Sequence, residues 1–226
     1  MAMTLPVLAP TSPGQLQRAL RGAEFTGLSR RGKYLVFELR PPGRRPPLIL
    51  VGHLGMTGRM YLTSRSAPLP KHAAVVLELG CERFVYEDAR YFGRLTLDTR
   101  ALSRLGPEPW SDDFTAATFG AALARSRQAI KVKLLDQSLV AGVGNIYASE
   151  ALFRARIAPQ LAARKLSLAQ VNVLRRTIRA VLVEAIRFGS TIPLHHGEKR
   201  GGAGLFYFGR AAGAADYHAK RLRVYD

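Results

Sequence analysis

The chain has 226 residues, of which 47% are hydrophobic and 22% charged, a composition typical of a folded globular protein and not of a disordered tail. Its 34 basic residues outnumber its 16 acidic ones, and the formal charge of +18 favours a polyanionic partner, most simply nucleic acid. The single cysteine, Cys81, excludes an intrachain disulfide and a multi-thiolate zinc site, and no apolar run reaches the roughly 18–20 residues that cross a bilayer.

A short helix is the first predicted element, with Ser12 as its cap, Pro13 at its first position and Gly22 as its stop. Short runs of strand-forming residues, separated by turns, follow at Leu35–Leu39, Leu48–Val51, Ala74–Leu79, Arg83–Tyr86 and Leu95–Leu97. Several strands without intervening helices predict an antiparallel sandwich or barrel. The proline-broken start of the chain has no basic region and is not a secretory signal, so we expect a cytoplasmic protein.

Residues 105–110 are interpreted as a linker, after which the apolar residues follow a helical period. Helices are predicted at about Thr115–Ser126, at about Ile130–Gln137, from Asn145, and from Ser167 to Gly189. The tail is glycine-rich and basic, and residues 221–225 could form a strand. The predicted class is α+β, with an antiparallel β-sandwich domain at residues 1–110 followed by an α-helical domain at residues 111–226.

The basic excess is concentrated in the second half of the chain. Residues 1–113 carry 16 basic and 10 acidic side chains, a net charge of +6, whereas residues 114–226 carry 18 and 6, a net charge of +12. Codon bias could produce an arginine-rich chain without any function. The uneven distribution favours a surface for a polyanion instead.

A loop with two glycines and an asparagine joins two of the predicted helices. Gly142 and Gly144 let the backbone come close to a ligand, and the helix that starts at Asn145 offers free N–H groups and a positive dipole end. These features suit a phosphate. A tight helical hairpin with a glycine stop explains the same spacing, and spacing alone does not separate the two interpretations.

Ordered motifs extend over nearly the whole chain. They are the basic run Arg30–Leu35, the loop Gly52–Gly58, the pair Lys71–His72, the block Asp88–Gly93, the segment Leu105–Pro109 and the run Ile130–Pro159. In this order they resemble the formamidopyrimidine-DNA glycosylase and endonuclease VIII family of helix–two-turn–helix DNA glycosylases. The resemblance implies a helix–two-turn–helix domain at residues 111–226. It also implies excision of oxidised or ring-opened purines, with AP-lyase strand cleavage, in base-excision repair.

The resemblance also gives roles to single residues. Lys33 matches the lysine that assists catalysis beside the phosphate flanking the lesion. Met56, Arg90 and Phe92 match the wedge that fills the gap left by a flipped base, although each alone would be interpreted as an ordinary core or surface residue. Further residues match the family's phosphate-binding surface, which Tyr147 lines. They are His53, His72, Lys131, Gly142, Gly144, Asn145 and Tyr147.

Both ends depart from the family's pattern. Members begin with Pro-Glu-Leu-Pro-Glu-Val, whose proline amine attacks the sugar and whose glutamate acts as acid and base, whereas this chain begins Met1-Ala2-Met3-Thr4. The family usually continues into a four-cysteine zinc ribbon, whereas this chain stops at Asp226. We therefore expect a β domain truncated at its N-terminus, no zinc ribbon, and no metal site or cofactor.

The expected partner is double-stranded DNA with damaged or abasic sites, bound by a monomer in the cytoplasm, at the nucleoid, without a membrane. Two other functions fit parts of the sequence. A non-catalytic binder of abasic or distorted duplex DNA would use the same loop and wedge. An RNA-binding structural protein could also use a helix–two-turn–helix, but the Met56, Arg90 and Phe92 motifs argue against it.

Overall fold

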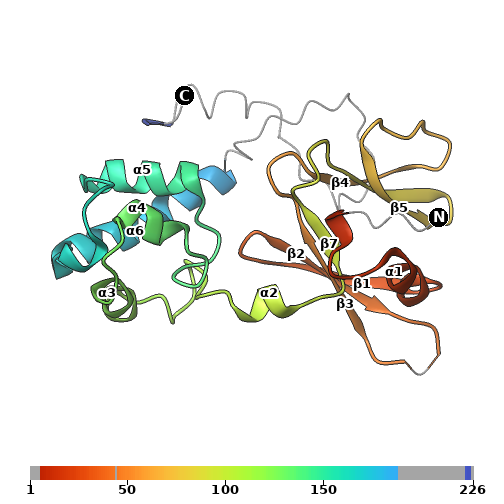
Figure 1. Cartoon of the computed structure of the whole chain (residues 1–226), viewed down its shortest axis with the longest axis horizontal. Helices are drawn as coiled ribbons and strands as arrows, with labels where there is room; N and C mark the ends of the chain where they lie inside the picture. The colour runs from red at the N-terminus through yellow and green to blue at the C-terminus, as the bar shows by residue number, and fades with distance from the viewer. Residues whose placement is uncertain (1–5, 44, 188–221, 225–226) are drawn as a thin grey trace. The chain divides into compact units, whose positions relative to one another are not determined.

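The computed structural model describes residues 6–43, 45–187 and 222–224 (Figure 1). The chain divides after Ser103 into a β unit and a helical unit, earlier than the boundary that the sequence predicted at residue 110. The predicted α+β class is confirmed, with antiparallel strands in the first unit and helices in the second.

Helix α1 (Pro13–Leu20) begins where the sequence predicted it. The Ser12 hydroxyl accepts a hydrogen bond from the Gln15 amide at 3.2 Å, and the Ser12 amide donates to the Gln15 side chain at 2.8 Å. This reciprocal pair is a capping box, and Pro13 adds the fixed φ that suits a first turn. A 3-10 turn, η1 (Pro6–Leu8), precedes the helix and buries Val7 and Leu8.

Two antiparallel sheets make up the β unit. One has the strand order β1 (Glu24–Arg31), β2 (Tyr34–Arg40), β3 (Leu48–His53) and β7 (Arg94–Thr96). The other has the order β4 (Arg59–Ser64), β6 (Glu82–Glu87) and β5 (Ala73–Leu79). Alternate residues of both sheets point into one core, where the Phe37 and Phe84 rings meet edge to face with centroids 5.7 Å apart.

The sequence did not predict β1 and β4. Strand β1 is an edge strand that contains Gly27 and three polar residues at its end, so its local signal is weak and its pairing with β2 holds it. Within the described part of the chain, strand β4 lies at the edge of its sheet and pairs with β6 alone. Five of the seven strands among the described residues fall on predicted runs, and the other two exist because a neighbouring strand offers hydrogen bonds.

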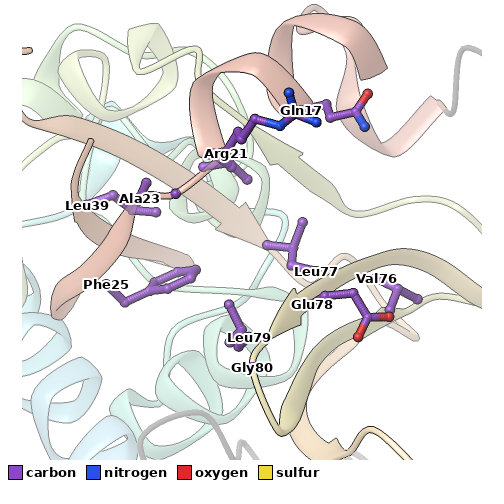
Figure 2. Close-up of a pocket in the computed structure, with 12 residues that line it drawn as sticks. Gln17, Arg21, Ala23, Phe25, Leu39, Val76, Leu77, Glu78, Leu79 and Gly80 are labelled. Carbon is purple, nitrogen blue, oxygen red and sulfur yellow. The ribbon is translucent and has the colours of Figure 1, made fainter. Parts of the chain in front are cut away.

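A hollow of about 550 Å³ lies beside the outer strands β1 and β5 (Figure 2). Apolar side chains line most of it, with Phe25, Leu39, Leu77 and Leu79 among them. The residues that the sequence singled out for function lie elsewhere in the chain. The hollow therefore belongs to the open flank of the sandwich and not to the candidate site.

The helical unit contains α3 (Ala116–Ala124), α4 (Ile130–Leu135), α5 (Asn145–Ala155), the 3-10 turn η2 (Ala163–Lys165) and α6 (Leu168–Arg187). Short helix α2 (Arg100–Ser103) ends the preceding unit. The predicted cap Ser167 is confirmed, because its hydroxyl accepts from the Gln170 amide. The predicted apolar stripe of α6 is buried throughout and consists of Val171, Leu174, Ile178, Val181, Leu182 and Ala185.

Two predictions in this half were wrong. The segment 105–110 is not a free linker, because the Gly106 amide donates to the Gln137 carbonyl and the Pro107 carbonyl accepts from Ala141. Residues 222–224 do not form a strand, since the Arg223 and Val224 amides donate to the buried Glu150 carboxylate instead of a neighbouring strand. The predicted stop at Gly189 and most of the glycine-rich tail lie outside the described residues.

Candidate nucleic-acid interface

Lys33 and His53 lie at the same end of the β1-β2-β3-β7 sheet. Gly32, with a φ of +58°, makes the tight turn that leads to Lys33, and the next residue, Tyr34, pairs directly with His53 across β2 and β3. Arg94 pairs with His53 from the other side, on β7. Burial, and then the charges of Lys33 and Arg94, lower the pKa of His53, and burial lowers the pKa of Lys33. Two cations and an imidazole thus share one end of the sheet.

The hydrogen bonding of His53 indicates which nitrogen carries its proton. The Gly55 amide donates to His53 Nδ1 at 3.1 Å. Because Nδ1 accepts, the proton of the neutral imidazole sits on Nε2. His53 can therefore donate from Nε2 to a phosphate oxygen even when its lowered pKa leaves it uncharged.

Met56, Arg90 and Phe92 meet although they come from two different loops. The Arg90 guanidinium lies over the Phe92 ring, 4.4 Å from its centroid, and Arg90 Nη1 lies 3.9 Å from the sulfur of Met56. Met56 is 62% exposed and Phe92 52% exposed, so neither is a core residue. An exposed cluster of a thioether, a guanidinium and an aromatic ring suits insertion between stacked bases.

Asp88 is fully buried and connects these two loops through hydrogen bonds. Its carboxylate accepts hydrogen bonds from the Thr57 hydroxyl at 2.6 Å and the Gly93 amide at 2.8 Å. The Arg90 amide and the Tyr86 hydroxyl donate to it at 3.2 and 3.3 Å. Burial alone would raise the pKa of Asp88, but these hydrogen bonds outweigh burial and the pKa is lowered. The backbone amide of Asp88 donates to the carbonyl of His72, which brings that half-buried histidine to the same region.

The second group of candidate residues lies in the helical unit, around the loop between α4 and α5. Gly142 has a φ of +91°, a conformation that favours glycine. The Gln137 side chain braces this loop, because its amide donates to the Val143 carbonyl at 2.8 Å and its oxygen accepts from the Gly142 amide at 3.0 Å. These hydrogen bonds fix the conformation of the loop just before α5.

Helix α5 begins at Asn145, which is exposed, and its N-cap residue Gly144 has no side chain to cover the first turn. The positive end of the helix dipole thus faces outward. Lys131 is half-buried on α4 and, with Ser149, lines a hollow of about 420 Å³. The ring of Tyr147 is partly buried and packs on the helical core and on Leu222, so it supports the first turn of α5.

Asp136 gives this loop a pH dependence that can be measured. Its carboxylate accepts from the Lys133 ammonium at 2.7 Å and from the Ser138 hydroxyl and amide, and these bonds lower the pKa of Asp136 to about 2. A lowered pKa stabilises the folded state above the unfolded value of 3.8, and this stability is lost as the pH falls from about 4 towards 2. Because the Asp136 side chain is 38% exposed, we expect its interactions to add about 1 kcal/mol to the free energy of unfolding at neutral pH.

The test is urea unfolding of the Asp136→Asn variant between pH 2.5 and 7. The variant should be less stable than the parent at pH 7 and nearly equal to it at the lowest pH. Asp112→Asn, at an exposed position in the same unit, is the control and should show no such difference. Equal stability of parent and Asp136→Asn at pH 7 would contradict the assigned role.

The structure thus gathers the predicted residues into two groups, one in each unit. Lys33, His53, Met56, His72, Arg90 and Phe92 belong to the β unit, and Lys131, Gly142, Gly144, Asn145 and Tyr147 to the helical unit. Sequence reasoning missed Asp88 and Gln137, although both lie inside quoted motifs. Irregular loops leave backbone N–H groups that need acceptors, and this requirement is the signal that could have indicated Asp88 and Gln137.

Comparisons with known proteins agree with this arrangement. The family model described as the formamidopyrimidine-DNA glycosylase N-terminal domain matches residues 3–95, and the model of the H2TH domain of the same enzyme matches residues 105–195. The formamidopyrimidine-DNA glycosylase of Paracoccus denitrificans is 42% identical over 209 residues, which cover 86% of this chain and 72% of that protein. The chain belongs to the formamidopyrimidine-DNA glycosylase family.

Other family members show how much of the fold is shared. The enzyme of Desulfitobacterium hafniense is 44% identical over 180 residues, and the match spans 76% of this chain but only 64% of that relative's length. The solved Lactococcus lactis enzyme in complex with DNA containing an abasic site superposes with a TM-score of 0.75 at 33% identity, covering 84% of this chain and 71% of that one. A second Lactococcus lactis complex contains DNA with FAPY-dG and superposes with a TM-score of 0.75 at 34% identity, covering 84% of this chain and 72% of that chain.

The residues described do not offer a ligand set for the zinc that members of the family usually hold. Cys81 is the only cysteine and is exposed, and no three histidine, cysteine, aspartate or glutamate side chains cluster within the described ranges. No chemical step is therefore assigned to zinc. In those same ranges, no helix combines the length and the apolar character needed to cross a bilayer.

Proposed function

We propose that this protein binds double-stranded DNA at damaged or abasic sites and excises oxidised or ring-opened purines, with strand cleavage, in base-excision repair. The observation that carries the proposal is the exposed cluster of Met56, Arg90 and Phe92, held beside Lys33 and His53 in a chain of this family. The Lactococcus lactis relatives bound to abasic and FAPY-dG DNA support it.

The geometry suggests how the parts share the task. A base in a duplex must leave the stack before its glycosidic bond is accessible, and the vacated space must be filled. Met56, Arg90 and Phe92 would fill it, since flat and flexible apolar groups stack between bases. Lys131 and the start of α5 at Asn145 would hold phosphates, which fixes the register of the duplex without reading its sequence.

Lys33 and His53 would act on the backbone next to the lesion. The Lys33 ammonium would hold a phosphate beside the sugar, and burial lowers the pKa of its amine. The Nε2–H of His53 would donate to a neighbouring phosphate oxygen. Such a role with chromosomal DNA would place the protein in the cytoplasm, at the nucleoid.

Fluorescence anisotropy with three labelled duplexes tests the binding: one undamaged, one with an abasic analogue and one with a ring-opened purine. We expect at least about tenfold tighter binding to the two damaged duplexes, within the several-kcal/mol range of specific over non-specific binding. Phe92→Ala should remove most of this preference. Leu69→Ala, which also truncates an exposed apolar side chain, should keep it. Equal affinity for all three duplexes would contradict the proposed binding.

Borohydride trapping on a true abasic duplex tests the chemistry separately. A covalent adduct together with a nicked strand supports the lyase activity. Preference for the abasic duplex without an adduct or nick would contradict catalysis by this chain and support the alternative, a non-catalytic binder of abasic or distorted DNA.

A further inference from the structure

The two loops that carry the wedge have almost no regular structure of their own. Residues 54–58 and 88–93 lie between strands, and Tyr91 in the second loop has a positive φ of 54°, which is uncommon outside glycine. Such conformations persist only where the surroundings fix them. Something must therefore hold both loops in register.

We propose that Asp88 is the positioning residue that fixes both loops as one unit, so that the wedge is formed before DNA binds. This inference rests on the proposed function and adds a residue to it. Each loop donates to the same carboxylate: Thr57, next to Met56, from the first loop, and the amides of Arg90 and Gly93 from the second. Asp88 thus contacts the backbone on both sides of Phe92.

The same network reaches the phosphate-facing histidine. The Tyr86 hydroxyl lies 3.3 Å from both the Asp88 carboxylate and the His53 carbonyl oxygen. The Nδ1 atom of His53 in turn accepts a hydrogen bond from the amide of Gly55, the residue before Met56. Moving Asp88 would therefore disturb the loops that carry the wedge, whereas strand pairing with Tyr34 and Arg94 keeps His53 in place.

A preformed wedge affects lesion selectivity more than general affinity. If the loops were mobile, binding at a lesion would have to order them. The entropy cost of this ordering would weaken the affinity for damaged DNA. Undamaged duplex keeps its bases stacked, so phosphate contacts hold it without the wedge. Loosening the loops should therefore lower the ratio of the two affinities.

Asp88→Asn tests this with little change in shape. Its amide group keeps one acceptor oxygen and replaces the other with an NH₂ donor. In one orientation this donor faces the donors of Gly93 and Tyr86. In the other it faces those of Thr57 and Arg90. We expect the Kd for abasic duplex to rise about tenfold or more, because charge-assisted bonds to a buried carboxylate are lost. The Kd for undamaged duplex should stay within about twofold and keep the same salt slope.

The matched control is Asp98→Asn. Asp98 also accepts a backbone amide and an arginine side chain in the same unit, but both come from Arg100, outside the wedge loops. It should leave the affinity ratio unchanged. Thr57→Val, which removes one donor only, should give a smaller loss of selectivity and remains informative if Asp88→Asn folds poorly.

Hydrogen exchange on the free protein supplies a second readout that does not depend on DNA. The Arg90 and Gly93 amides should exchange slowly in the parent and at least about tenfold faster in Asp88→Asn. An unchanged affinity ratio, equal weakening on both duplexes, or unchanged exchange would overturn the proposal. If the parent itself shows no preference for abasic DNA, the proposed function fails, while the exchange rates still decide the role of Asp88.

Discussion

Replacing Gly93 with alanine is expected to destabilise the β unit by about 3 kcal/mol or more and to abolish selectivity for abasic DNA, within the range of severe core and backbone mutations. A Cβ at this position would overlap the Tyr86 hydroxyl and the His53 carbonyl oxygen, and it would lie 3.0 Å from the Leu54 carbonyl carbon. Two of these neighbours are backbone and the third is fully buried, so they cannot move aside easily. Urea unfolding measures the first effect, and anisotropy with abasic and undamaged duplexes measures the second.

Gly120→Ala is the control for this prediction. Gly120 lies inside α3, where the nearest atom to a new Cβ is 3.6 Å away, an ordinary contact. Alanine there should be neutral or stabilising by up to about 1 kcal/mol, because glycine is the poorer helix former. If Gly93→Ala were as stable and as selective as the parent, the close packing of the wedge loops against β3 and Tyr86 would be refuted.

The second large effect is expected from the double variant Lys131→Ala, Asn145→Ala. We expect its affinity for every duplex, damaged or not, to fall about 10- to 100-fold near 0.1 M salt, since phosphate contacts supply sequence-independent affinity. The slope of log K against log salt should become shallower by about 1, because a single cationic contact is lost. The preference for abasic over undamaged DNA should remain.

Lys165→Ala controls for the loss of a positive charge. Lys165 ends the 3-10 turn η2 and is exposed. Its removal should leave both the affinity and the slope nearly unchanged. A double variant that binds undamaged duplex as tightly as the parent would refute the assignment of phosphate contacts to α4 and the start of α5.

These expected results separate two contributions to DNA binding. Changes around Asp88 and Gly93 should alter the ratio between damaged and undamaged duplex, because they act on the wedge. Changes at Lys131 and Asn145 should alter both affinities together, because phosphates are their proposed partners. The two groups belong to different units of the chain.

Local signals in the sequence were sufficient for much of the fold. Ser12 and Gln15 form the capping box of α1, and the apolar stripe of α6 is buried at every predicted position. These features depend on residues three or four apart, which interact as soon as a helix forms. The family motifs likewise singled out the loops of Met56 and Phe92 and the loop before α5, whose roles in DNA binding stay predictions.

The sequence alone determined the fold class, the strongest helices and strands, the family and the basic character that points to DNA. The tertiary structure decided what depends on distant partners: strands β1 and β4, the attachment of residues 105–110 to the helical unit, and the exposure of Met56 and Phe92. It also revealed Asp88, whose partners at Thr57 and Gly93 are unremarkable in one dimension. The reason is physical, since a buried carboxylate is stable only where several donors converge, and folding alone brings them together.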